Sequence, residues 1–150
     1  MFRQSFINTN SLELRMVYIR QRITIVNIRK PNKHNVNEEL QWLGSSLGLF
    51  NLRDRDKSCF RLFIELLKSA KARNTLTSDE LATRLTLSRG TIIHHINRLM
   101  ESGLVIHEGN HYILRVENLS ALIEEVEKDI KRACDDLREI AKEIDERLGL

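Results

Sequence analysis

Helical segments with their own start signals, followed directly by two short β-prone runs, occupy residues 56–115. Asp56 is a good N-cap for a first helix that extends to about Arg73. Thr77 and Glu80 have the spacing of a capping box, in which each side chain bonds the other residue's amide, and they start the second helix. Apolar residues at helical spacing predict the buried face of the first helix: Phe60, Phe63, Leu67 and Ala70.

A third helix and a hairpin complete this region. Ser88 caps the helix, which extends to Ser102 and stops at Gly103. The two β runs, residues 104–107 and 111–115, are joined through Gly109-Asn110, a dipeptide that favours a two-residue hairpin loop. The sequence therefore predicts a mainly helical fold with a small β-hairpin, built from a helix, a second helix, a turn, a third helix and the hairpin.

The third helix has two chemically different sides. On a helical wheel, Ile92, Ile96 and Leu99 form a narrow apolar stripe that we expect to be buried. A free-standing surface helix would normally carry lysine and glutamate on the opposite side. Here that side instead carries small and hydrogen-bonding residues, with others flanking them: Gly90, His94 and Asn97, flanked by Thr91, Ile93 and Arg98.

The segment Leu81–Val105 resembles prokaryotic winged helix-turn-helix regulators of the ArsR and MarR type. The resemblance lies in the pattern LA..L.LSR.T...HI..L...GLV followed by a short hairpin, and it leaves the first 50 residues unmatched. It implies a winged helix-turn-helix domain that binds double-stranded DNA sequence-specifically and regulates transcription, with the Ser88–Ser102 helix in the major groove.

The resemblance also implies a role for each residue on the exposed side of that helix. Gly90 would let the backbone approach the duplex, His94 and Asn97 would bond base edges, and Ile93 would touch a thymine methyl group. This chain departs from the pattern at Ile93, where many relatives have a small polar residue. The amino end of the helix would bind a phosphate. The DNA-binding residues expected on this basis are Ser88, Arg89, Gly90, Thr91, Ile93, His94, Asn97 and Arg98.

Two further groups of residues are candidates for contacts to the DNA backbone. The first group lies ahead of the first helix and consists of Arg53, Arg55 and Lys57. These residues either contact phosphates or form a solvated charged run interleaved with Asp54 and Asp56. Among the four residues that the hairpin offers for such contacts, only Arg115 carries a charge at neutral pH, so the sequence predicts a short, weakly basic wing. These four residues are His107, Asn110, His111 and Arg115.

Residues 119–148 predict a last helix of about 45 Å. Apolar residues alternate there in steps of three and four, which is the seam of a coiled coil. We expect a second copy of the chain to cover this seam, giving a homodimer that binds an inverted repeat; the alternative is that the helix folds back on residues 38–50. The seam consists of Ile123, Val126, Ile130, Ala133, Leu137, Ile140 and Ile144.

Charge divides the chain into three parts. Residues 1–35 carry a net charge of +6 and contain a β-branched stretch at 16–28, which predicts a strand or a basic arm. Residues 36–116 form the DNA-binding domain, which starts with a short helix at about 38–48 capped by Asn37. The last part, residues 117–150, is the dimerisation helix, and its net charge is −4 over residues 119–150.

Other functional classes lack a motif in this sequence. There is no phosphate-binding glycine loop, nucleophile elbow or HExxH motif, so we expect neither an enzyme nor a cofactor. Cys59 and Cys134 are far apart, so we expect no metal site and a reduced, cytoplasmic compartment without membrane contact. A winged-helix module that binds only proteins, in a larger assembly, is the alternative function, and RNA binding is a third. The sequence specifies no effector and no operator.

Overall fold

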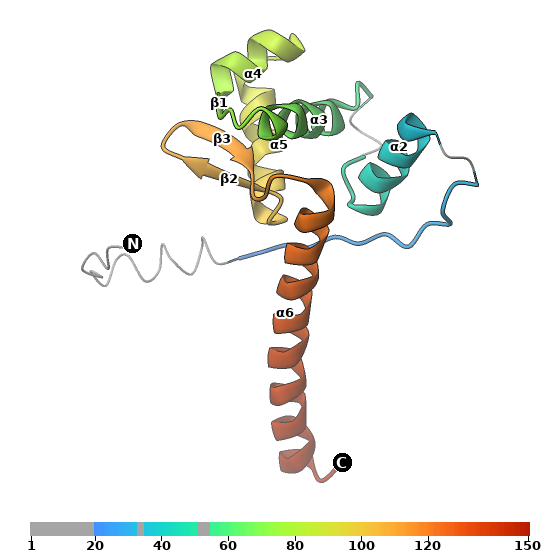
Figure 1. The fold of residues 1–150 in the computed structure, drawn as a ribbon. Helices are drawn as coiled ribbons and strands as arrows, with labels where there is room; N and C mark the ends of the chain where they lie inside the picture. Colours follow the sequence, from blue (N-terminus) through green and yellow to red (C-terminus); the bar gives the residue numbers. More distant parts are fainter. Residues whose placement is uncertain (1–19, 33–34, 51–54) are drawn as a thin grey trace.

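The structure, a computed structural model, describes residues 20–32, 35–50 and 55–150. Within these ranges the chain is mainly helical, with a small antiparallel sheet and a long last helix, which confirms the predicted fold class (Figure 1). The helices are α2 (Val36–Ser46), α3 (Ser58–Lys71), α4 (Ser78–Leu85), α5 (Arg89–Glu101) and α6 (Leu119–Leu148). The strands are β1 (Leu76–Thr77), β2 (Val105–Glu108) and β3 (His111–Leu114).

The core lies where α3, α4 and α5 meet the sheet and the first turns of α6. Its fully buried side chains are mostly leucine and isoleucine, together with Phe63 from α3. The predicted face of α3 was partly wrong, because Phe60 and Leu67 are only half-buried at its edge. The face that packs inward is rotated by about one residue and consists of Cys59, Leu62, Phe63, Leu66 and Ala70.

Two helix starts differ from the predictions. α3 begins at Ser58, and its N-cap is Lys57 in the left-handed conformation with no side-chain hydrogen bond, so Asp56 does not cap it. α2 begins at Val36, and Asn35 caps it by accepting a hydrogen bond from the Asn37 amide over 2.9 Å. The predicted cap residue is therefore inside the helix, because an equivalent side chain two residues earlier takes that role.

The sheet has a third strand that the sequence did not predict. β2 and β3 form the expected hairpin, with Glu108 opposite His111, so that Gly109 and Asn110 make a two-residue loop. β1 pairs antiparallel with the other side of β3, placing Leu76 opposite Tyr112. A strand of two residues has no alternation to recognise, and its two residues pair with residues 36 and 34 positions away.

Residues 20–32, which we call the strap, run in an extended conformation across the start of α6 and then turn towards α2 (Figure 1). The strand predicted at 16–28 is wrong for residues 20–28, and residues 16–19 lie outside the described part. The strap bonds to helix ends instead of to a strand: the Arg22 amide donates to the Glu101 carbonyl and the Val26 amide to the Ser46 carbonyl, each over 2.8 Å.

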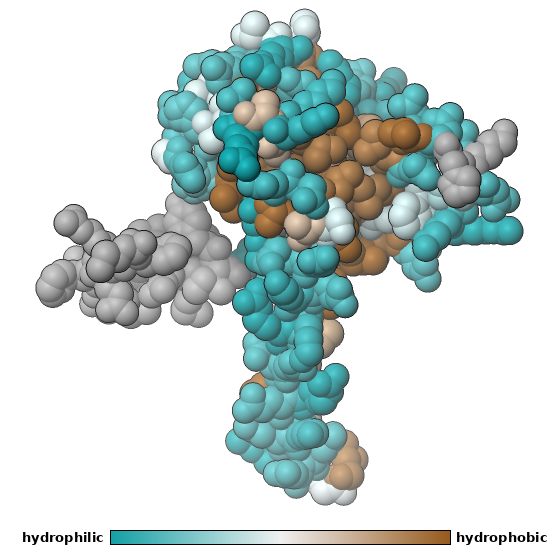
Figure 2. Space-filling view, in the orientation of Figure 1, coloured by the Kyte–Doolittle hydropathy of each residue, from teal (hydrophilic) through white to brown (hydrophobic). Residues whose placement is uncertain are grey.

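α6 begins on the core and then leaves it. Leu122 and Val126 are buried, whereas every residue from 131 to 150 is exposed. Figure 1 shows its carboxyl half projecting from the domain, and in Figure 2 the visible face of this helix is mostly hydrophilic, while apolar side chains gather over α3 and α2. None of the described helices has the length and apolar character needed to cross a membrane.

Candidate nucleic-acid interface

A tight turn sets the angle between α4 and α5. The predicted capping box is confirmed, since the Thr77 amide donates to Glu80 over 2.8 Å and the Glu80 amide donates to the Thr77 hydroxyl over 3.1 Å. Thr86 adopts the left-handed conformation that ends α4. Ser88 then caps α5 by accepting from the Thr91 amide over 3.1 Å. Each of these contacts spans a few residues, which is why the sequence alone located both helix starts.

The two sides of α5 lie as predicted. Ile92, Ile96 and Leu99 are fully buried in the core, and His95 is buried beside them. Gly90, His94 and Asn97 are exposed on the opposite side, and Thr91 and Ile93 are half-buried at its edges. We call the set formed by the exposed Gly90, His94 and Asn97 and the half-buried Ile93 the recognition face.

Gly90 is not required by the packing of the described chain. A Cβ atom built at this position would meet only the Ser88 hydroxyl, at 4.0 Å, and the backbone there is ordinary helix. Glycine in the middle of a helix is less stable than alanine by roughly 0.5–1 kcal/mol, which is an upper limit for Gly90 because it is the second residue of α5. A glycine that costs stability and is not needed internally leaves room for something outside the chain to approach α5.

Arg98 lies away from the recognition face. Its guanidinium donates to the Gly48 carbonyl over 3.3 Å, and the side chain is half-buried between α5 and the loop after α2. From the sequence, Arg98 was expected to flank the exposed side of this helix and to contact DNA. The structure directs it towards the interior side, so it is not brought together with His94 and Asn97.

Most positive charge near the α5 amino end is already paired. Arg89 lies 3.6 Å from Asp79 of α4, and both side chains are largely exposed. Arg84 bonds Glu65 over 3.0 Å. Exposed pairs of this kind contribute little to stability and are screened by salt. Arg89 is therefore free to exchange Asp79 for a phosphate at small cost.

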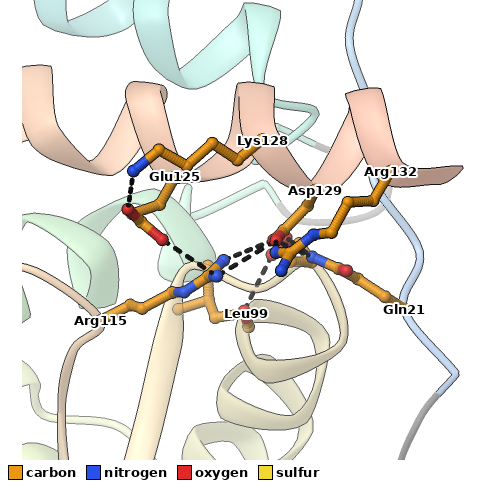
Figure 3. Close-up of polar contacts among 8 residues, drawn as sticks. Gln21, Leu99, Arg115, Glu125, Lys128, Asp129 and Arg132 are labelled. Atoms are coloured by element: carbon orange, nitrogen blue, oxygen red, sulfur yellow. Dashed lines mark hydrogen bonds and ion pairs between the residues drawn. The ribbon is translucent and has the colours of Figure 1, made fainter. Parts of the chain in front are cut away.

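The wing is short and its tip carries no cation. His107, Glu108, Asn110 and His111 are exposed there, and Glu108 is an acid. Arg115, predicted as the charged residue of the wing, instead turns inward. Figure 3 shows its guanidinium lying against Glu125 and Asp129 of α6.

Asp129 is the centre of a polar cluster that joins α6, the base of the wing and the strap (Figure 3). It accepts hydrogen bonds from Arg115, from Arg132 over 2.5 Å and from Gln21 over 2.8 Å. The Arg115 guanidinium and the other two donors hold the pKa of this buried carboxyl far below its ordinary value of 3.8. The same contact raises the pKa of Arg115. Asp129 is therefore ionised whenever the domain is folded near neutral pH.

The basic residues before α3 are only partly described. Arg53 lies outside the described residues. Arg55 is exposed, and the Lys57 ammonium lies 5.6 Å from the centre of the Phe50 ring, a cation–π distance. Whether these residues contact DNA stays a prediction.

The predicted seam of α6 divides into two parts. Val126 is buried in the chain's own core and Ile130 packs against it. Ile123 is 38% exposed. Beyond them, Ala133 is exposed, and the seam residues Leu137, Ile140 and Ile144 are 70%, 54% and 47% exposed. The first turns of α6 therefore pack on the same core as α3 and α5. The predicted division of the chain into separate parts at residue 117 stays a prediction.

The order of α3, α4, α5 and the β2–β3 hairpin is that of a winged helix-turn-helix. Residues 64–106 match the winged helix-turn-helix DNA-binding family. The matched segment begins inside α3 and ends in β2, so it contains all of α4 and α5. It supports double-stranded DNA as the partner and transcription regulation as the role, whereas the narrower ArsR and MarR type stays a prediction. No curated protein and no solved structure gives a significant match to the chain.

Sequence reasoning missed two charged residues of this region. The sequence predicted no role for Asp79, although in the structure it is the partner of Arg89. The sequence also predicted no role for Asp129, which entered only the net charge of residues 119–150, although it is only 8% exposed. One signal was available for Asp129: it is three residues after Val126, on the side of the helix that faces the core.

Proposed function

We propose that this protein is a homodimeric transcription regulator that binds an inverted repeat in double-stranded DNA through the recognition face of α5. The observation that carries the proposal is the recognition face itself. It lies opposite the buried stripe of α5, and in the described chain all of it except the half-buried Ile93 is exposed. It also belongs to a segment that matches a DNA-binding family.

The residues of the recognition face suit the chemistry of the major groove. The Asn97 amide can donate and accept at once, as the edge of adenine requires, and the His94 ring offers one further donor or acceptor. Ile93 would supply apolar contact to a thymine methyl group, and Gly90 would permit close approach of the backbone.

The amino end of α5 suits a phosphate. The Ser88 hydroxyl satisfies the Thr91 amide, and the helix dipole favours an anion at this end. Arg89 adds a cation whose present partner, Asp79, is exposed. Contacts of this kind fix the position of the protein on the duplex without reading sequence.

Dimerisation through the exposed half of α6 compensates for weak electrostatics. A single recognition helix with one cation at its amino end, Arg89, and a wing tip that carries no cation would bind poorly at physiological salt. Two such helices related by a two-fold axis would read half-sites roughly 34 Å apart. The exposed apolar stripe at Leu137, Ile140 and Ile144 is the surface that we assign to the second copy.

The test begins with DNA recovered by crosslinking in cells and sequenced. We expect an enriched inverted repeat, and we expect the purified chain to bind it as a dimer, with an affinity that falls steeply as salt rises. Sedimentation with labelled duplex measures the stoichiometry. The proposal fails if no duplex is enriched and the chain stays unbound at low salt.

A second candidate function is a winged-helix module that binds proteins and not DNA. The observation that favours it is the small positive charge of the interface, with Glu108 on the wing and Arg89 paired with Asp79. The same sedimentation experiment distinguishes the two functions, because this module would show no affinity for any duplex.

A further inference from the structure

A cavity of about 420 Å³ lies beside α5 on the side away from the recognition face. Its walls come from segments far apart in the sequence: the strap, the loop after α2, the start of α3 and the end of α5. Cavities that hold small ligands typically measure 300–1,000 Å³ and combine apolar walls with a few converging polar groups. The volume of this cavity is in that range, and its wall combines apolar residues with two arginines and a glutamate.

Among the residues that the structure describes, the charged groups of the cavity form no ion pair. Arg22 from the strap and Arg98 from α5 both line it, and within the described residues neither has a carboxylate partner. The contact of Arg98 is the Gly48 carbonyl, at 3.3 Å. A guanidinium is a planar donor suited to carboxylate and phosphate oxygens, and bonds to those groups are stronger than a bond to a neutral carbonyl.

The remaining walls define the rest of the ligand. Leu47, Leu49 and Cys59 supply apolar surface at the inner side. Glu101 also lines the cavity, is exposed, and has no ion pair in the described part of the chain. A ligand that binds all three charged residues needs an anionic group for the two arginines. It also needs a separate hydrogen-bond donor for the Glu101 carboxylate.

We propose that this cavity binds a small organic anion of metabolite size, held through a carboxylate or phosphate group by Arg22 and Arg98 and through an amino or hydroxyl group by Glu101. The site is independent of the recognition face, so ligand binding does not rest on DNA binding. Arg98 directly follows Asn97 in α5, so a ligand bound to Arg98 could change the affinity for DNA. That effect, unlike ligand binding itself, rests on the proposed function.

The strap is held tightly over this site. The Arg22 amide donates to the Glu101 carbonyl over 2.8 Å, and a Cβ atom added to Gly48 would lie 2.7 Å from the Thr24 methyl group. A ligand that bridges Arg22 and Arg98 would therefore join the strap to α5 and stabilise the folded chain, because it binds only when both segments are in place.

The experiment is calorimetry and thermal unfolding of the full chain without DNA. The probes are succinate, glutamate, glycerol 3-phosphate and phosphoserine, at constant ionic strength, with inorganic phosphate and chloride as references. We expect submillimolar binding of at least one organic anion and a rise in Tm. The carboxylate and phosphate probes distinguish the two anionic groups, and glutamate against succinate tests the donor group facing Glu101.

Matched variants locate the site. Arg22→Gln and Arg98→Gln should each weaken the binding about tenfold or more, since each removes a charge-assisted contact. Arg29→Gln removes the same charge from an exposed strap position outside the cavity and should leave the affinity within about twofold. Arg22 has no side-chain bond in the described chain, so its variant should fold normally. The proposal is overturned if no organic anion binds more tightly than inorganic phosphate, or if Arg29→Gln weakens binding as much as Arg22→Gln.

Discussion

Arg115 at the base of the wing forms a bidentate ion pair with Asp129 of α6, and this pair joins the DNA-binding domain to the projecting helix. Gln21 of the strap bonds the same carboxylate over 2.8 Å. The wing, the strap and α6 therefore share one buried charge. Whatever orients α6 in a dimer also orients the wing.

Replacing Asp129 should destabilise the fold in a pH-dependent way. Asp129→Asn leaves Arg115 half-buried without its main partner, and we expect a loss of about 2 kcal/mol in the free energy of unfolding at pH 7. The pKa of Asp129 is lowered in the folded chain. Its stabilisation is therefore complete above the ordinary value of 3.8 and is lost as the pH falls below it towards the folded pKa.

Urea unfolding between pH 3 and pH 7 measures this effect. The unfolding free energy of the wild type should decrease below about pH 4, and the Asp129→Asn variant should show a shallower decrease. Asp136→Asn is the control, because Asp136 is exposed on the same helix and has no ion pair among the described residues. Equal pH profiles for wild type and Asp129→Asn would show that the cluster does not stabilise the fold.

Gly90→Ala should separate stability from binding. The added methyl group has open space in the folded chain and favours helix, so the free energy of unfolding should rise by up to about 1 kcal/mol. The same methyl group would lie between α5 and the duplex, and DNA affinity should fall about tenfold. Denaturant titration and fluorescence anisotropy measure the two effects. A more stable variant with unchanged affinity would place the duplex elsewhere.

Asp79→Asn should strengthen DNA binding without changing its sequence preference. It releases Arg89 from a pair at 3.6 Å and removes a negative charge beside the expected phosphate. We expect affinity to rise severalfold for cognate and unrelated duplexes alike, with a steeper dependence on salt. Titrations at several salt concentrations test this against Asp136→Asn, which makes the same charge change far along α6. Identical behaviour of the two variants would exclude a local role for Arg89.

Leu137→Gln should weaken the dimer and leave the domain folded. Leu137 is 70% exposed in the single chain, so the domain does not depend on it, whereas a coiled-coil seam would bury it. Sedimentation equilibrium should show a shift towards monomer, and Lys142→Gln, outside the seam on the same helix, should not. A wild-type protein that is already monomeric would refute dimerisation through α6.

The parts of the fold that sequence predicted are those fixed by short-range contacts. The capping box at Thr77 and the Ser88 cap span three residues each, and the stripe of Ile92, Ile96 and Leu99 follows from helix periodicity. Local chemistry of this kind is visible without a structure. It was enough to place α4, α5 and the hairpin.

The rest depends on contacts between residues far apart in the chain. β1 exists because Leu76 meets Tyr112, and the strap is held by Glu101 and Ser46 and not by a neighbouring strand. Arg98 turns towards Gly48, 50 positions earlier, which no helical wheel shows. The sequence thus predicted which side of α5 faces outward. It did not predict the partners of the charged residues near the candidate interface, because those partners lie on other elements.

The central claim is that the recognition face of α5 reads DNA bases. The most direct test is to measure the base preference at each position of the bound DNA for the Asn97→Ala variant. Wild type and variant are each given a random duplex library, and the bound sequences are compared, with Arg89→Ala as the second variant. We expect Asn97→Ala to lose discrimination at one position of each half-site, worth about 1–3 kcal/mol, while Arg89→Ala weakens all sequences alike. If both variants select the same sequences with the same affinity as the wild type, the recognition face of α5 does not read DNA.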